Sequence, residues 1–195
     1  MLVALDGPAG AGKSTVARAV ADALGFTYLD TGAMYRCVGL RAAARPDVPL
    51  DPAALDIAFD GDRVLLDGED VSTAIRTPEA GLAASRVATD PAIRSTLVDL
   101  QRKIIADGDW VAEGRDIGTV VAPDAEIKVW LTADPEERAR RREIPVAELL
   151  ERDERDASRE SSPMKPAADA IEVDTTGLSL DEVIARITGL VGSVR

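Results

Sequence analysis

The sequence predicts an α/β fold in which a five-stranded parallel sheet is flanked by helices. Short apolar runs that are typical of buried strands recur along the chain, and helical patterns lie between them. Alternation of this kind places parallel strands in one sheet with helices on its faces. The expected strands are Leu2–Leu5, Phe26–Leu29, Trp110–Ala112, Ile127–Leu131 and Ala170–Val173.

The helices between these strands carry start signals. A capping residue followed by proline occurs at Thr77, Asp90 and Asp134, and Ser179 with Glu182 has the spacing of a capping box. One stretch departs from the alternation. Within residues 56–71, two Asp-Gly turn signals separate short β-like runs, which predicts a small antiparallel insert.

The composition argues against several classes of function. The chain has 195 residues and a formal net charge of −12, so we expect no basic face for nucleic acid or for an anionic membrane. It contains no histidine, which removes serine–histidine nucleophile pairs and histidine metal sites. Cys37 is the only cysteine, so no internal disulfide can form, and we expect a buried thiol in a cytoplasmic protein.

A phosphate-binding motif occupies residues 7–14. The segment GPAGAGKS matches G-x-x-x-x-G-K-[ST] and lies between an expected strand and a helical pattern. Its glycines let backbone N–H groups approach phosphate oxygens, and the helix N-terminus adds partial positive charge. Lys13 would reach the β- and γ-phosphates, while the Ser14 hydroxyl would ligate Mg²⁺. The alternative is a glycine-rich turn that carries Lys-Ser by chance, but the strand and helix context favours binding of a nucleoside triphosphate.

Two further clusters concern the acceptor of the phosphoryl group. Thr31 is a helix-capping candidate after the second expected strand, and Arg36 follows on the same helix, where it can face the cleft. The alternative there is a surface helix with a solvated arginine. Arg115 and Asp116 follow the third strand, at the end where open α/β sheets bind ligands. The alternative for this pair is a structural ion pair.

A third cluster lies at residues 151–159. On a helix, Arg152, Asp156 and Arg159 share one face. A solvated ladder of salt bridges is the usual interpretation of such a run. The other interpretation places these side chains in the acceptor site.

Taken together, these segments resemble the bacterial cytidylate kinases, the (d)CMP kinases of the nucleoside monophosphate kinase family. The resemblance covers nearly the whole chain and rests, in this order, on GPAGAGKST, LDTGAMYR, EDVSTAIRT, AASRVA, EGRDIGTVV and ERDERDASR. EGRDIGT is the most discriminating of them. The resemblance implies a P-loop kinase fold with a single kinase domain, residues 1–195, whose core covers roughly 1–35, 90–135 and 165–195. It further implies a β-containing monophosphate-binding insert at roughly 36–89 and a lid at roughly 136–160.

The resemblance also implies roles for individual residues. The phosphates of ATP would be held by Gly7, Pro8, Ala9, Gly10, Ala11, Gly12, Lys13, Ser14 and Thr15. The phosphate of CMP would be positioned by Thr31, Arg36 and Arg115, and the cytosine edge would be read by Ser85, Arg94 and Asp116. Asp156 with Arg152 would contact the sugar hydroxyls, and Arg159 would face the same pocket. The residues expected to act in catalysis are Lys13, Arg115, Arg141 and Arg152.

The expected lid departs from the family pattern. The run Glu136–Arg142 resembles the start of that lid, whose arginines close over the transferring phosphoryl group. Its alternative is a basic helix face paired with the two glutamates. Only residues 143–150 separate this run from ERDERD, where relatives have a longer helical segment. A short lid is therefore expected, with Arg138, Arg141 and Arg142 as candidates for contact with the γ-phosphate.

The sequence thus predicts an enzyme that uses Mg²⁺ and ATP to phosphorylate CMP and dCMP. A monomer with no nucleic-acid or membrane partner is expected. One alternative is a kinase of another small acceptor, such as UMP, AMP or shikimate. A second is a P-loop switch protein that binds nucleotide to regulate a partner. A third is a nucleotide-binding relative whose catalysis is weak because of the short lid.

Overall fold

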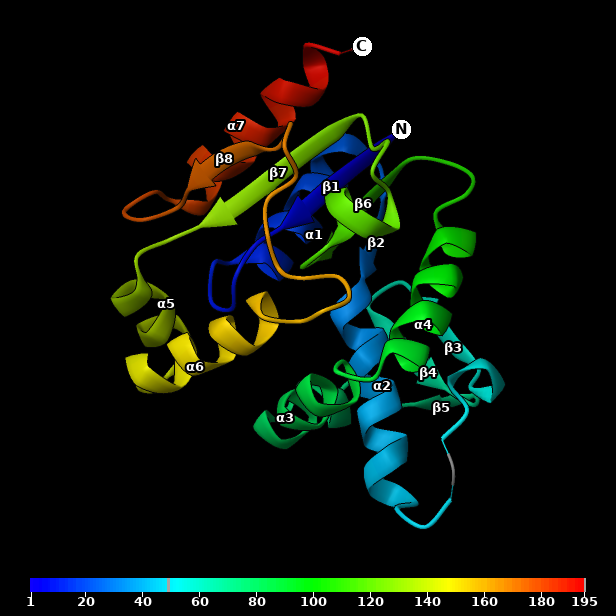
Figure 1. Cartoon of the computed structure of the whole chain (residues 1–195). Helices are drawn as coiled ribbons and strands as arrows, with labels where there is room; N and C mark the ends of the chain where they lie inside the picture. Colours follow the sequence, from blue (N-terminus) through cyan, green and yellow to red (C-terminus); the bar gives the residue numbers. More distant parts are fainter. Residues whose placement is uncertain (49, 195) are drawn as a thin grey trace. The chain divides into compact units, whose positions relative to one another are not determined.

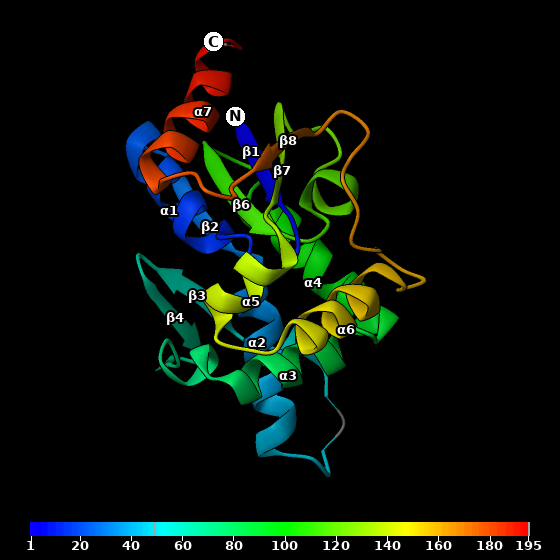
Figure 2. The same cartoon turned by 90° about the vertical axis from the view of Figure 1, so that its left-hand side faces the viewer.

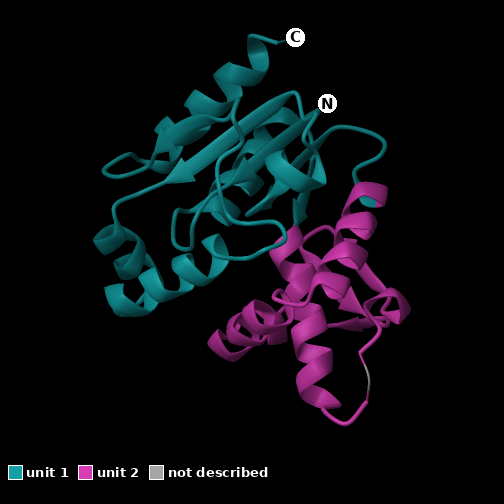
Figure 3. Ribbon diagram, viewed as in Figure 1, with its two compact units in different colours: residues 1–30, 104–195 teal, residues 31–103 magenta. Residues whose placement is uncertain are grey.

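The computed structural model describes residues 1–48 and 50–194, which form two compact units (Figure 3). The first unit is Met1–Asp30 with Ile104–Arg195, and the second is Thr31–Lys103. The helices are α1 (Lys13–Leu24), α2 (Thr31–Ala44), α3 (Pro78–Val87), α4 (Pro91–Ile104), α5 (Pro135–Arg142), α6 (Val146–Ala157) and α7 (Leu180–Gly192). The strands are β1 (Leu2–Asp6), β2 (Thr27–Asp30), β3 (Ile57–Asp60), β4 (Arg63–Leu66), β5 (Glu69–Asp70), β6 (Trp110–Gly114), β7 (Ile127–Thr132) and β8 (Ile171–Asp174). Within the described ranges, no helix has the length and apolar character needed to cross a membrane.

The first unit is built on a five-stranded sheet with the strand order β2-β6-β1-β7-β8. All of its neighbouring strands pair in parallel. Helices α1 and α7 lie together on one face of this sheet (Figures 1 and 2). Their aliphatic side chains join those of the strands in one core, which includes Val3, Leu5, Val16, Val20, Val129, Val183 and Ile187. The predicted parallel sheet is confirmed, and each of its strands begins within one residue of the predicted start.

Local sequence signals account for where several helices begin and end. Helix α1 ends at Gly25, whose left-handed φ of 67° lets its N–H reach the last carbonyl groups of the helix. Helix α7 begins with the predicted capping box, in which Ser179 and Glu182 each bond the other's backbone N–H. Asp134 precedes α5, but its side chain makes no capping hydrogen bond.

Helices α5 and α6 form a hairpin joined by residues 143–145. The hairpin has its own small hydrophobic cluster, in which Ala139 and Leu149 pack with Ala9 of the phosphate-binding loop. Ile144 and Val146 pack against the same cluster. The segment expected to form the lid is therefore anchored to the loop by buried apolar contacts.

The second unit contains a three-stranded antiparallel sheet, β3-β4-β5, at the position predicted for the insert. Asp67 and Gly68 join β4 to β5 with φ angles of 52° and 82°, as a tight hairpin turn requires. Cys37 is buried in α2, as expected. The unit extends from residue 31 to 103, beyond the insert boundaries expected at 36 and 89, and the division of the chain into core, insert and lid stays a prediction.

Candidate active site

The phosphate-binding loop connects β1 to α1, and at two positions only glycine fits. Gly7 has a φ of 153° and Gly10 a φ of 77°. A methyl group at Gly7 would lie 2.0 Å from the carbonyl oxygen of Leu131, and one at Gly10 would lie 2.5 Å from that of Arg138. The loop is thus packed directly against the backbone of β7 and α5, which fixes its path before any ligand binds.

Lys13 begins α1 and lies among other positive charges. Its Nζ donates a hydrogen bond to the carbonyl oxygen of Pro8 at 2.8 Å, so the side chain folds back over the loop. Desolvation of the ammonium group lowers the pKa of Lys13 below its ordinary value. Arg115 and Arg142 lower this pKa further, against the opposite effect of Glu113 and Asp6. A bound triphosphate would offset the repulsion among these cations.

Oxygen donors lie next to the loop at Ser14. Ser14 is exposed, and it forms a hydrogen bond with the buried carboxylate of Glu113. The phenol of Tyr28 donates a second hydrogen bond to Glu113 at 2.5 Å. Burial raises the pKa of Glu113, and the neighbouring charge of Asp30 raises it further. The Ser14 hydroxyl and the Glu113 carboxylate are hard oxygen donors, of the kind that a divalent cation such as Mg²⁺ prefers.

Arg115 joins three segments of the first unit that are far apart in the sequence. Its Nη1 donates to the carbonyl oxygen of Gly7 at 2.9 Å and contacts the sulfur of Met164 at 3.4 Å. Its Nη2 lies 3.2 Å from Oδ2 of Asp156 on α6. The neighbouring Asp116 is 6% exposed and precedes the short helical turn Ile117–Val121. The arginine predicted for the acceptor site therefore lies directly at the phosphate-binding loop.

The cluster on α6 is not the solvated ladder that was the alternative interpretation. Asp156 is 2% exposed and pairs with both Arg115 and Arg159. Burial and the positive charges of Arg115 and Arg142 lower the pKa of Arg152 to about 10. Within the described part of the chain, Nε of Arg152 has no hydrogen-bond partner. A set of crowded, partly buried guanidinium groups is thus gathered in the first unit.

The three candidate lid arginines have different surroundings. Arg138 is 6% exposed, and its guanidinium donates to the carbonyl oxygens of Ala133 and Ala9 and to Asp153. Arg138 therefore links α5 to the phosphate-binding loop and to α6, which is a structural role. Arg141 donates to Glu137 and to both oxygens of Thr175, and its Nη1 lies 3.8 Å from where a methyl group on Gly12 would be.

Arg142 is the third of these arginines. It is exposed, and its charge acts on both Lys13 and Arg152. The alternative interpretation of the run Glu136–Arg142 was a basic helix face paired with the two glutamates. It applies only to Arg140 and Arg141, which both pair with Glu137.

Sequence reasoning missed two buried polar residues beside the loop. The hydroxyl of Thr175 accepts the bond from Arg141 and donates to the carbonyl oxygen of Thr132 at 3.0 Å, while the carbonyl oxygen of Ala11 lies 3.4 Å away. The carboxylate of Asp6 accepts hydrogen bonds from the N–H groups of Ile117 and Gly118. Asp6 ends β1 and Thr175 follows β8, so the rule that ligands bind at the carboxyl ends of parallel strands would have pointed to both.

The remaining predicted CMP-binding residues belong to the second unit. Thr31 begins α2 and Arg36 lies on it, while Ser85 lies on α3 and Arg94 on α4. Thr31, Ser85 and Arg94 are all less than 9% exposed. The guanidinium of Arg94 stacks over the ring of Tyr35 at 5.4 Å and donates to the carbonyl oxygen of Ala88 at 3.4 Å. The predicted CMP site is thus divided between the two units, and its assembly stays a prediction.

The family model for cytidylate kinase matches residues 3–193. This chain belongs to the cytidylate kinase family. The cytidylate kinase of Carboxydothermus hydrogenoformans is 46% identical, with 98% of this chain and 97% of the relative covered. That of Fervidobacterium nodosum is 46% identical, with 97% and 95% covered.

The alignment with the Carboxydothermus relative also bears on chain length. It runs over 221 positions, more than the 195 residues of this cytidylate kinase family member. The relative therefore has residues with no counterpart here. This agrees with a shortened segment somewhere in the chain, and the sequence predicts that segment to be the lid.

Solved structures support the fold. A gluconokinase from Sinorhizobium meliloti matches with a TM-score of 0.55 at 16% identity, with 98% of this chain and 92% of that chain covered. A shikimate kinase from Acinetobacter baumannii matches with a TM-score of 0.51 at 16% identity, with 98% and 93% covered. The predicted P-loop kinase fold is confirmed, and the family identifies a nucleoside monophosphate kinase.

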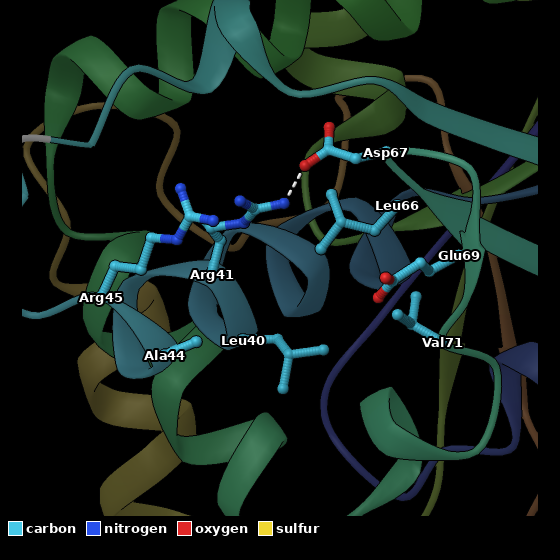
Figure 4. A pocket seen from close by; sticks show the side chains of 8 residues that line it. All are labelled: Leu40, Arg41, Ala44, Arg45, Leu66, Asp67, Glu69 and Val71. Carbon is cyan, nitrogen blue, oxygen red and sulfur yellow. Dashed lines mark hydrogen bonds and ion pairs between the residues drawn. The ribbon is translucent and has the colours of Figure 1, made fainter.

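A separate pocket of about 400 Å³ lies within the second unit, between the end of α2 and the small antiparallel sheet (Figure 4). An ion pair between Arg41 and Asp67 spans it. The residues that line it are Leu40, Arg41, Ala44, Arg45, Leu66, Asp67, Glu69 and Val71. None of the residues predicted for the active site is among them.

Proposed function

We propose that this protein transfers the γ-phosphoryl group of ATP to CMP and dCMP, which gives ADP and the nucleoside diphosphate. The observation that carries the proposal is the cationic cluster of Lys13, Arg115 and Arg152 around the phosphate-binding loop, in a chain with a formal net charge of −12. An acidic protein gathers partly desolvated cations at one place when it must bind several phosphates there. Family membership supports CMP as the acceptor.

On the donor side, the loop from Gly7 to Thr15 binds the phosphates of ATP through its backbone N–H groups. Lys13 leaves the carbonyl oxygen of Pro8 and turns to the β- and γ-phosphates. Ser14 would hold Mg²⁺, which would supply charge neutralisation at the same phosphate oxygens. Glu113 accepts a hydrogen bond from Ser14 and so orients its hydroxyl.

On the acceptor side, a phosphate oxygen of CMP forms the new bond to the γ-phosphorus while the bond to the β–γ bridging oxygen breaks. Arg115, with Thr31 and Arg36, positions the acceptor phosphate, because a guanidinium fork matches phosphate oxygens bidentately. No strong base is required, since the acceptor is already an oxyanion. Arg152 adds positive charge beside the phosphates and, with Asp156, contacts the sugar hydroxyls.

Recognition of cytosine is assigned to Asp116, Ser85 and Arg94. A carboxylate and a hydroxyl can match the mixed donor and acceptor edge of cytosine. Uracil replaces the exocyclic amine with a carbonyl, which would leave a buried polar partner without its hydrogen bond. Arg159, which pairs with Asp156, is assigned to the same pocket.

The lid arginine that contacts the transferring group is proposed to be Arg141. Thr175 and Glu137 hold its guanidinium near Gly12 of the loop. Arg142 is placed to add positive charge, since it acts electrostatically on Lys13 and Arg152. Closure of the lid would exclude water, which is a competing acceptor. A cytoplasmic location and a monomeric state complete the proposal.

The deciding experiment is the release of ADP from Mg²⁺-ATP with CMP, dCMP, UMP, AMP or shikimate as acceptor. Strong stimulation by CMP and dCMP alone is expected. Stimulation by a different acceptor would replace the proposed substrate. If no acceptor stimulates although ATP and CMP both bind in calorimetry, the short lid does not close productively and the protein is a binding relative with weak catalysis.

A further inference from the structure

Asp6 is a buried carboxylate with a specific pair of partners. It ends β1, immediately before Gly7, and is 5% exposed. Its Oδ1 accepts the N–H of Ile117 at 2.9 Å, and its Oδ2 accepts the N–H of Gly118 at 2.8 Å. These two N–H groups belong to the first residues of the turn Ile117–Val121 and have no carbonyl partner within that turn. Both carboxylate oxygens are therefore used to hold a segment more than 100 residues away in the sequence.

The segment held in this way carries the acceptor-side residues of the first unit. Arg115 and Asp116 directly precede Ile117, so the turn and these two side chains share one stretch of backbone. Arg115 is tied to the loop at its other end, through the carbonyl oxygen of Gly7. Asp6 and Gly7 are adjacent, and the two contacts therefore fasten the 115–118 segment to the start of the phosphate-binding loop.

The charged groups around Asp6 come from three elements. Asp116, from the segment after β6, raises its pKa, and Lys13, from α1, lowers it. Lys128, from β7, passes its aliphatic stem against Gly118, but its ammonium group pairs with Asp169 and the carbonyl oxygen of Pro123. No cation pairs directly with Asp6 in the described part of the chain, so the two backbone N–H groups stabilise its charge more than Lys13 does.

We propose that Asp6 is a positioning residue for the acceptor. Its carboxylate holds the 115–118 segment, and with it Arg115 and Asp116, in the geometry that binds the nucleoside monophosphate. Protonation of the carboxylate releases this segment. The inference rests on the proposed function. A protonated carboxyl group keeps one full acceptor oxygen and turns the other into a hydroxyl donor, which opposes an N–H group. Burial raises the pKa of Asp6 to about 6, so the change falls within an accessible range of pH.

The test compares the wild-type protein with Asp6→Asn from pH 5 to 8. Asparagine has the same shape but one acceptor oxygen. At pH 8 the KM for CMP is expected to rise about fivefold or more, as loss of one buried hydrogen bond predicts, while the KM for ATP stays within about twofold. The ratio of kcat/KM for CMP between the two proteins should shrink below pH 6. Because both proteins act on the same substrates, titration of the substrate phosphates cancels in this ratio.

A second variant, Gly118→Ala, crowds the held segment against the side chain of Lys128 and keeps the carboxylate. Its methyl group would lie 3.2 Å from Cδ of Lys128 and 3.5 Å from Oδ2 of Asp6. It should raise the KM for CMP and keep the acid limb of the wild-type profile. This variant decides the question if Asp6→Asn does not fold.

The outcomes separate the inference from the proposed function. If CMP does not stimulate ADP release by the wild-type protein, the proposed function fails and the inference fails with it. If CMP is a substrate but the variants raise the KM for ATP as much as that for CMP, Asp6 supports the fold alone. A ratio that does not change with pH would also overturn the inference.

Discussion

Replacement of Arg138 should show that this arginine stabilises the fold beneath the phosphate-binding loop. In Arg138→Met the aliphatic stem is kept and the guanidinium is lost. The carboxylate of Asp153, whose side chain is 15% exposed, then loses its cation, and the carbonyl oxygens of Ala9 and Ala133 lose their donor. Removing one partner of a buried ion pair costs about 3–5 kcal/mol, and we expect a loss of about 4 kcal/mol in the free energy of unfolding.

The assay is equilibrium unfolding in urea at pH 7. The midpoint should fall, with an unchanged slope, because the surface exposed on unfolding is the same. Arg138→Met combined with Asp153→Leu removes both charges and should lose clearly less than the sum of the single changes. Arg140→Ala is the matched control, since Arg140 is on the same helix with a side chain that is 74% exposed, and it should unfold like the wild-type protein.

Two results would refute this reasoning. If Arg138→Met loses less than about 1 kcal/mol while kcat falls by orders of magnitude, the guanidinium serves the phosphoryl group. If the single changes are simply additive in the double variant, Arg138 and Asp153 are not coupled.

Four further predictions follow from the site. Lys13→Ala should lower kcat by orders of magnitude with the cooperative unfolding transition retained, and activity within about threefold of wild type would refute the catalytic role of the loop. Asp116→Ala should raise the KM for CMP more than that for ATP in steady-state assays, whereas a purely structural role would lower the melting temperature instead. Arg141→Ala should lower kcat much more than Arg140→Ala does, and equal effects would remove Arg141 from the proposed lid contact. The carboxyl group of Asp6 binds its proton more tightly in the folded state than in the unfolded state, so its contribution to stability falls as pH rises from its ordinary value of 3.8 to about 6. This corresponds to about 2 kcal/mol between pH 4 and pH 7 that Asp6→Asn should abolish, and parallel pH profiles of the unfolding free energy would contradict it.

Much of the fold could be predicted because its signals are local. The strand, glycine loop and helix around Lys13 occupy consecutive residues, and the hairpin turn at Asp67 depends on the φ angles of two neighbours. The capping box of Ser179 closes within four residues. Each of these depends on backbone preferences and short-range hydrogen bonds, which a sequence pattern records directly.

The roles of the charged side chains could be predicted only in part. The sequence left a solvated ladder open for Asp156. It predicted a catalytic role for Arg141 but left open which of Arg138, Arg141 and Arg142 contacts the γ-phosphate. The tertiary structure distinguishes their roles. Asp156 is buried between two arginines, and Arg138 donates a hydrogen bond to the carbonyl oxygen of Ala9 in the phosphate-binding loop. Burial and pairing of charges depend on which distant segments meet, and the spacing of residues along one helix does not contain that information.

Sequence patterns were sufficient to predict the family resemblance, the succession of strands and helices along the chain, and the chemistry of the phosphate-binding loop. Only the tertiary structure brought Asp6 to the N–H groups of Ile117 and Gly118, and Thr175 to the guanidinium of Arg141. These contacts join residues that are more than 30 positions apart. They form because the carboxyl ends of neighbouring strands meet at one edge of the sheet. Polar groups that are buried there, away from water, form hydrogen bonds with one another.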